Sequence, residues 1–211
     1  EEGGNDKGKN VTNLIVNPNF ENNIDGWSWD NSKRKPISGG PSSNLCMESW
    51  NSSFDLYQDI TDLPNGVYEV KVQAFYRTGG SIIDAYNEYH SGSAAEILAY
   101  VYANDYSKKV PNIFSVSYTE NLADDCSDVL FDGTTYVVNG WNSASEAFNR
   151  GDYECSVYCL VTDGKLRIGI RETEGTDSNR WTLWDNFRLV YHENNDKLLD
   201  CLTKINEAKA L

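Results

Sequence analysis

Short runs of alternating apolar and polar residues, separated by clusters of Gly, Asn, Asp and Pro, extend along residues 13–191. This pattern is typical of antiparallel β-sandwiches and barrels, whose strands bury one face and expose the other. The clearest run covers residues 67–76, where apolar side chains alternate with Glu69, Lys71 and Gln73 after a Pro-Asn-Gly turn. Because successive side chains of a strand point to opposite faces, this run predicts a strand with one buried face.

The same alternation predicts further strands along the chain, at residues 14–16, 56–60, 97–103, 114–118, 135–138, 153–161, 165–170 and 181–191. An Asp163-Gly164 pair separates two of these strands and supplies the positive φ of a tight turn, so we expect them to form a hairpin. Helical periodicity is nearly absent before residue 192. Three long irregular segments interrupt the strands, and loops of such length in a compact domain are usually functional or mobile: residues 28–46, 77–95 and 120–151.

Both ends of the chain differ from this pattern. Residues 1–12 are polar and Gly-rich, which predicts a flexible segment. Residues 196–211 place Leu198, Leu202 and Ile205 on one helical stripe, which predicts a helix. We therefore expect a flexible segment at 1–12, a sandwich domain at 13–192 and a C-terminal helix at 193–211. Because no C-cap residue ends this helix before Leu211, we expect the natural chain to continue. The helix is expected either to pack under the sandwich or to begin a following module.

Two phrases resemble the ends of a known fold. Residues 13–21, Asn-Leu-Ile-Val-Asn-Pro-Asn-Phe-Glu, followed by Gly26-Trp27, resemble the first strand of galactose-binding-like jelly-roll modules, which include many carbohydrate-binding modules. Residues 181–189, Trp-Thr-Leu-Trp-Asp-Asn-Phe-Arg-Leu, resemble their last strand, and residues 63–68 resemble a central one. The chain is also similar to surface and periplasmic glycan-utilisation modules of Bacteroidetes. The resemblance implies an all-β fold, a jelly-roll β-sandwich of two antiparallel sheets, here with a short C-terminal helix.

The resemblance further implies a structural calcium ion. In such modules, acids that match Glu21 and Asp185 hold the ion together with a backbone carbonyl that matches Asn19. Calcium prefers carboxylate and carbonyl oxygens, so this set suits the ion. The alternative is that both acids form ordinary hydrogen bonds at strand ends. Nearby, Trp27 is expected to pack in the core, whereas Trp181 is open to either role.

Aromatic residues are abundant, with 13 Tyr and 6 Trp, so that rings remain for the surface after a core is filled. Sugar rings stack on indole and phenol faces, and an exposed ring needs a cover. Asn142 and Asp84 supply directional hydrogen bonds. The alternative is that each ring pins its own loop. The expected carbohydrate-binding residues are those of the irregular segments: Trp29, Trp50, Arg77, Tyr86, Tyr89 and Trp141.

Charge and cysteine content exclude several function classes. The formal net charge of -14 opposes nucleic-acid binding, which depends on phosphate neutralisation. No apolar run approaches the roughly 20 residues that span a bilayer, so membrane insertion is not expected. Five Cys without a CxxC pair and only two His disfavour a zinc site. Cys155 and Cys159 lie on one strand face about 13 Å apart, too far for a disulfide, and are expected to be core hydrophobes.

Catalytic motifs are absent from the sequence: there is no nucleophile elbow, HExxH or phosphate-binding loop. Two carboxylates at glycosidase spacing are easily found among 32 acidic residues, so their presence is not informative. We therefore expect a secreted, periplasmic or cell-surface module that binds carbohydrate without catalysis, whether or not an enzyme is attached. The alternative is a structural or protein-interaction domain that contacts adjacent modules. The basic run Lys33-Arg34-Lys35 suits either an acidic glycan or a solvated loop.

Overall fold

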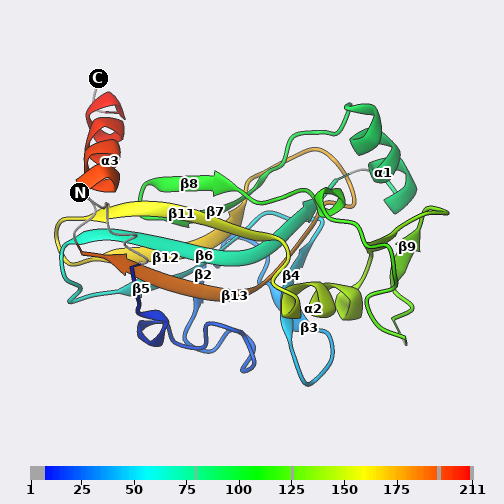
Figure 1. Cartoon of the computed structure of the whole chain (residues 1–211), viewed down its shortest axis with the longest axis horizontal. Helices are drawn as coiled ribbons and strands as arrows, with labels where there is room; N and C mark the ends of the chain where they lie inside the picture. The colour runs from blue at the N-terminus through cyan, green and yellow to red at the C-terminus, as the bar shows by residue number, and fades with distance from the viewer. Residues whose placement is uncertain (1–7, 79, 125, 194–195, 210–211) are drawn as a thin grey trace, which may run out of the picture.

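The computed structural model describes residues 8–78, 80–124, 126–193 and 196–209. Two antiparallel sheets pack face to face, which confirms the predicted β-sandwich (Figure 1). Sheet A contains, in spatial order, β11 (Glu154–Val161), β6 (Gly66–Arg77), β13 (Trp181–His192), β4 (Cys46–Trp50) and β3 (Ile37–Gly39), with β1 (Lys9–Asn10) beside β13. Sheet B contains β2 (Ser28–Trp29), β5 (Phe54–Ile60), β12 (Leu166–Glu172), β7 (Ala99–Ala103) and β8 (Tyr106–Lys109).

The main core lies between the sheets and follows the alternation of the sequence. Val70 and Val72 of β6 and Leu56 of β5 belong to this core, and all three side chains are fully buried. At its centre the indole of Trp184 stacks on the ring of Phe54, with centroids 4.8 Å apart. Burial of each such side chain stabilises the fold by about 1.5–3 kcal/mol.

A β-bulge between residues 185 and 188 breaks the period of two in β13. Simple alternation places Trp184 and Phe187 on opposite faces, but both are buried in the core between the sheets. Asn186 in the bulge adopts a positive φ of 55°, which inserts one extra residue and turns Phe187 back inward. There Phe187 packs against Trp27, with ring centroids 4.8 Å apart, so Trp27 is a core residue as predicted.

The predicted hairpin around Gly164 is wrong. Gly164 has the expected positive φ of 72°, but β11 pairs with β6 in sheet A while β12 lies between β5 and β7 in sheet B. The turn is held by the neighbouring crossover, because Leu63 N–H donates to Gly164 O at 3.1 Å. A turn signal is local, so it specifies a reversal of the chain and not the pairing of the two strands.

Two short predicted strands are also wrong. Residues 12–14 form the 3-10 helix η1 (Thr12–Leu14), and Val16 N–H donates to the side chain of Gln58 at 2.8 Å instead of joining a ladder. Within residues 114–118 the chain forms η2 (Ile113–Ser115), capped by Asn112, whose Oδ1 accepts from Phe114 N–H at 2.9 Å. In both segments side-chain oxygens satisfy the backbone and replace strand pairing.

Two helices lie inside the irregular segments, where none was expected. Helix α1 (Ile82–Ser91) begins after Ser81, whose Oγ accepts from Asp84 N–H at 3.1 Å, and ends at Gly92 with a left-handed φ of 76°. Helix α2 (Trp141–Asn149) begins where the carboxylate of Asp128 accepts backbone N–H groups. Caps of these kinds are the signals that the strand interpretation missed.

The two helices build a second hydrophobic cluster on the outer face of sheet A. Together with the hairpin of β9 (Val129–Phe131) and β10 (Tyr136–Val138) they gather at one end of the sandwich (Figure 1). Phe75 and Leu183 of the sheet pack there with Phe148 of α2. These elements, α1, α2 and the β9–β10 hairpin, are called the cap below. The cap covers part of the outer sheet face that the alternation pattern predicted to face solvent.

The predicted C-terminal helix is confirmed as α3 (Asp196–Lys209). It packs on the sandwich at the end opposite to α1 and α2 (Figure 1), because Leu202 belongs to the main core and the Tyr106 hydroxyl donates to Asn206 Oδ1 at 2.6 Å. Cys155 and Cys159 are also buried in the main core, as expected. None of the helices in the described residues combines the length and apolar character that crossing a membrane requires.

Candidate functional site

Three neighbouring strands of sheet A bring Trp50, Trp181 and Arg77 into one row on its outer face. Trp181 of β13 pairs with Trp50 of β4 on one side and with Arg77 of β6 on the other. The Arg77 guanidinium lies over both indoles, with Cζ 5.3 Å from the Trp50 centroid and 5.1 Å from that of Trp181. The structure thus joins two of the predicted carbohydrate-binding residues, Trp50 and Arg77, across strands distant in sequence.

Arg77 supports Trp50 from within the protein. It is buried, its Nη1 donates to Asn139 Oδ1 at 3.2 Å, and burial lowers its pKa. Trp50 is half-buried, so part of its ring reaches solvent while the cation holds the ring from inside. Arg77 therefore positions the indole and offers little surface of its own.

Glu48 lies on the same face of β4, two residues before Trp50. Its Oε2 accepts from Trp181 Nε1 at 2.7 Å. Burial raises the pKa of Glu48, while the Trp181 hydrogen bond and the charge of Arg34 act in the opposite direction. Arg34 also donates to Trp50 O at 3.1 Å. The sequence interpretation missed Glu48, although alternation in residues 46–50 places it on the Trp50 face.

Trp141, the first residue of α2, covers the adjacent edge strand. A Cβ atom at Gly39 would lie 2.8 Å from the Trp141 ring, so the indole lies directly on the backbone of β3. Gly39 pairs with Cys46, which lies on the same face of β4 as Trp50 and four residues before it. At about 3.3 Å per residue, the two half-buried indoles are separated by about 13 Å along the strand.

We call this surface the tryptophan strip, defined by Trp50, Glu48, Ile37 and Trp141. Ile37 pairs with Glu48 between the two indoles and is 49% exposed. The strip offers two aromatic surfaces, an apolar side chain and a carboxylate along one sheet edge. Such a mixture of ring faces and few polar groups is typical of small-ligand sites.

The other predicted rings lie elsewhere. Trp29 of β2 packs against the main core, with Lys35 Nζ 4.6 Å from its ring centroid. Tyr86 and Tyr89 of α1 pack against the ring of Phe114, with centroids 5.5 and 5.8 Å away. These two tyrosines anchor α1 against Phe114, which is the alternative role considered for loop aromatics.

The predicted polar groups have local partners. The Tyr86 hydroxyl donates to Asp132 Oδ2 at 2.7 Å, and Asp84 belongs to the N-terminal cap of α1. Asn142 directly follows Trp141 in the chain and is exposed. Of the six predicted carbohydrate-binding residues, Trp50, Arg77 and Trp141 lie on or directly under one surface. Tyr86 and Tyr89 pack against the same second hydrophobic cluster through α1, and Trp29 packs against the main core.

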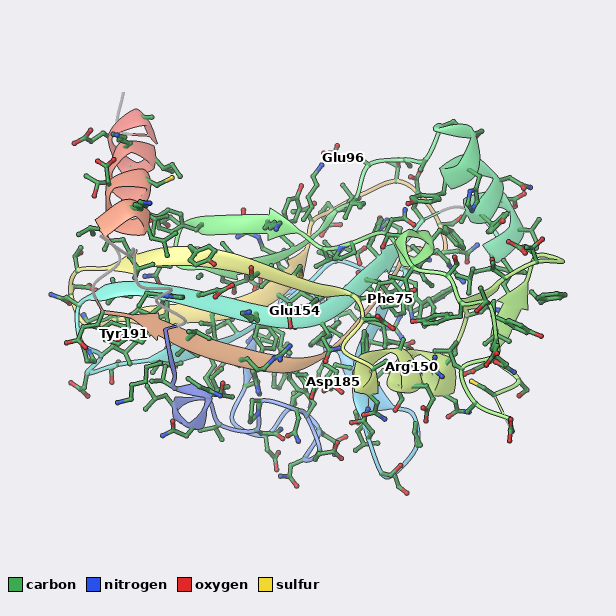
Figure 2. All side chains as sticks on the ribbon, in the orientation of Figure 1. Phe75, Glu96, Arg150, Glu154, Asp185 and Tyr191 are labelled. Carbon is green, nitrogen blue, oxygen red and sulfur yellow. The ribbon has the colours of Figure 1, made fainter. Side chains whose placement is uncertain are left out.

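Asp185 is fully buried beside the bulge of β13, next to α2 (Figure 2). Its Oδ1 accepts from Asn186 N–H at 2.7 Å, whereas its Oδ2 has no hydrogen-bond partner within the described part of the chain. Burial raises the pKa of Asp185 to about 8, and the negative charge of Glu21 adds to this effect. A buried carboxylate oxygen that has no partner and lies near a second carboxylate favours the binding of a cation, which stabilises the folded state.

A backbone hydrogen bond holds residues 18–21 beside the bulge of β13: Phe187 N–H donates to Pro18 O at 2.8 Å. Glu21 is half-buried, and Asn19 lies between Pro18 and Glu21 in the chain. Among the described residues, no three His, Cys, Asp or Glu side chains are grouped to hold a metal ion. The residues present fit a calcium site made of two carboxylates completed by backbone oxygens, and not a site of side chains alone.

No family model and no curated protein matches this sequence. Solved structures with a similar arrangement include TmCBM61 in complex with beta-1,4-galactotriose, 16% identical, with 84% of this chain and 97% of that chain covered and a TM-score of 0.46. The mannan-recognising carbohydrate-binding module TmCBM27 is 10% identical, with 83% and 95% covered and a TM-score of 0.35. The K3 adhesin domain of Lys-gingipain from Porphyromonas gingivalis is 13% identical, with 83% and 96% covered and a TM-score of 0.39. The sandwich assignment rests on the strand pairing.

Proposed function

We propose that this domain is a non-catalytic carbohydrate-binding module and that the tryptophan strip holds its ligand. The observation that carries the proposal is the shared face of Trp50 and Trp141, two half-buried indoles about 13 Å apart along one sheet edge. Pyranose rings stack on indole faces. An oligosaccharide spans this separation, whereas a single sugar does not, so a chain of sugars is the expected ligand.

The polar groups at the strip orient the sugar through directional hydrogen bonds. Glu48 accepts hydrogen bonds from sugar hydroxyls, and Arg34 and Asn142 donate to hydroxyl oxygens. Both indoles are held in place before binding, Trp50 by Arg77 and Trp141 by the backbone of Gly39. Because a rigid site loses less conformational entropy, this arrangement favours binding. An open strip of this size predicts affinities of about micromolar to millimolar.

Replacement of Trp50 or Trp141 by alanine is expected to weaken oligosaccharide binding about tenfold each, because each removes one stacking surface. The measurement is isothermal titration calorimetry, with affinity-gel retardation over a panel of soluble polysaccharides that includes β-1,4-galactan and mannan. Tyr86→Phe is the matched control, since it changes an aromatic residue of the cap outside the strip. Melting temperatures identify any variant that loses structure.

The possible outcomes separate the functions. Unaltered binding in both tryptophan variants would place the site elsewhere on the sandwich. Absence of binding to the whole panel favours the alternative of a structural or protein-interaction domain that contacts adjacent modules. Release of reducing ends would instead indicate an enzyme.

We also propose that Glu21, Asp185 and the backbone carbonyl of Asn19 hold a structural calcium ion. When bound, the ion supplies the positive charge that keeps the buried Asp185 side chain ionised. Asp185 places one oxygen at the bulge, and the Phe187–Pro18 hydrogen bond keeps the first segment of the domain beside it. The ion would therefore stabilise the junction between residues 18–21 and the last strand.

In a secreted, periplasmic or cell-surface protein, a module of this kind keeps an attached enzyme or the cell itself close to polysaccharide. Each single site binds weakly. Several sites on one chain or one surface gain by avidity, because the second contact is intramolecular.

A further inference from the structure

A groove of about 830 Å³ lies on the outer face of sheet B, on the other side of the sandwich from the tryptophan strip. It extends toward α3, where Asn206 lines it. Its lining includes Asp55 of β5, Tyr102 of β7, Arg167 and Arg171 of β12, and Asn104, which follows β7. A cavity of this volume lies in the range of sites that bind small molecules.

The floor of the groove is a tyrosine laid flat on the sheet. Tyr102 of β7 and Tyr57 of β5 flank Gly169 of β12 in one row. A Cβ atom at Gly169 would lie 2.6 Å from Tyr102 Cζ, so only glycine leaves room for this ring. The Tyr102 hydroxyl donates to Asp55 Oδ1 at 2.6 Å. The side chain therefore crosses over β12 and reaches β5. Burial, and then this hydrogen bond, raise the pKa of Tyr102, so the phenol stays neutral.

Two arginines of β12 lie on these rings, one on each side of Gly169. Arg167 Cζ is 4.0 Å from the Tyr57 centroid, and Arg171 Cζ is 5.0 Å from the Tyr102 centroid. Guanidinium groups stack on aromatic faces and then present their N–H edges sideways. The stacking therefore fixes the direction in which each arginine donates.

The two arginines differ in their partners. Arg167 forms a bidentate ion pair with Asp59, with Nε–Oδ1 and Nη2–Oδ2 distances of 2.7 and 2.8 Å. Arg171 forms no ion pair with any of the residues that the structure describes, and its buried Nε has no hydrogen-bond partner there. Because Arg171 lines the groove, its unpaired guanidinium charge is available there to an acidic ligand, whereas the enclosed Nε is not.

We propose that this groove is a second binding site, and that it takes an acidic oligosaccharide whose uronic-acid carboxylate pairs with Arg171. The planar guanidinium fork matches a carboxylate in bidentate geometry. Asp55 and Asn104 line the same groove and serve the hydroxyls of the sugar. Because Asp105 and Asp163 also line the groove and the protein carries a net charge of -14, a densely charged polyanion is repelled, whereas a sugar with one carboxylate is tolerated at Arg171. The site does not depend on the tryptophan strip.

The test compares a trisaccharide that contains one galacturonate residue with neutral galactotriose by isothermal titration calorimetry on the whole chain. Wild-type protein is expected to bind the uronate at least tenfold more tightly than the neutral sugar, with an affinity that falls as salt rises. Arg171→Gln is expected to remove this preference. Arg171→Lys, which retains the charge but not the fork, should lose most of it, and serves if the glutamine variant fails to fold. Arg188→Gln is the matched control, since Arg188 lies on sheet A and pairs with Glu154.

The outcomes also separate this site from the strip. Trp50→Ala should leave uronate binding unchanged. If Trp50→Ala abolishes it, the uronate lies on the strip, and the groove proposal is wrong while the proposed function stands. Equal affinity for the acidic and neutral sugars, an unchanged preference in Arg171→Gln, or no uronate binding at all would each overturn the groove proposal.

Discussion

Replacement of Arg180 by alanine is expected to lower the free energy of unfolding by about 3–5 kcal/mol. Arg180 and Glu172 are 4% and 0% exposed, and Arg180 Nε lies 2.8 Å from Glu172 Oε1. Without the guanidinium, the carboxylate stays buried with Thr182 Oγ1, 2.6 Å from its Oε2, as its remaining side-chain donor among the described residues. Urea unfolding followed by tryptophan fluorescence measures the loss.

The control is an exposed ion pair on the same strand. In the Arg167–Asp59 pair the side chains are 47% and 54% exposed, so Arg167→Ala is expected to cost less than about 1 kcal/mol. Similar losses in the Arg180 and Arg167 variants would contradict the argument that burial decides the effect.

The loss in Arg180→Ala should also depend on pH. Burial already raises the pKa of Glu172 above its ordinary value of 4.5, and removal of the cation raises it further. A group whose pKa is higher in the folded state loses stabilisation as pH rises through that pKa. The variant's deficit is therefore expected to be smaller near pH 4 than at pH 7, and a deficit that does not change with pH would contradict this account.

Arg180 also connects this ion pair to the tryptophan strip. Its Nη1 donates to Gly175 O at 2.6 Å and to Asp177 O at 2.9 Å, which orders the loop before β13. Its backbone oxygen accepts from Asn51 N–H at 2.6 Å, directly after Trp50. Loss of Arg180 is thus expected to weaken sugar binding as well as stability.

Calcium is expected to raise the melting temperature of the chelator-treated protein by about 5–10 °C when present at about one hundred times its Kd. Ligand binding to the folded state contributes about 2.7 kcal/mol at that ratio, and a chain of this size gains about 2–4 °C per kcal/mol. The gain arises because the buried carboxylate of Asp185, with its unpartnered Oδ2, acquires a counterion. Differential scanning calorimetry with chelator, calcium or magnesium measures it.

Asp185→Asn separates the calcium effect from general salt effects. This variant should no longer respond to calcium. In chelator near pH 7 it should melt close to the wild type, because the raised pKa of about 8 keeps Asp185 neutral there without the ion. Asp59→Asn, at an exposed position, should keep the full calcium response. Melting that is unchanged by both chelator and calcium in the wild type would contradict the proposed site.

The residues of the tryptophan strip could be predicted individually from the sequence, but not as a group. Trp50, Arg77 and Trp141 were predicted one by one, but the sequence offered no reason to separate them from Tyr86 and Tyr89. Cross-strand register and the docking of α2 make that separation, and both involve contacts between distant parts of the chain. Local signals did exist for the missed groove, since alternation in β12 places Arg167, Gly169 and Arg171 on one face.

The sequence alone determined that the chain forms short antiparallel strands with one buried face, and that a helix follows the last strand. Period-two burial and the Leu stripe of α3 are local patterns, so they survive whatever the strands pair with. Only the tertiary structure decided that β11 and β12 lie in opposite sheets and that the bulge at Asn186 turns Phe187 inward. It also decided that α1 and α2 cap one end of sheet A. These choices follow from the packing of the whole core, which no window of sequence contains.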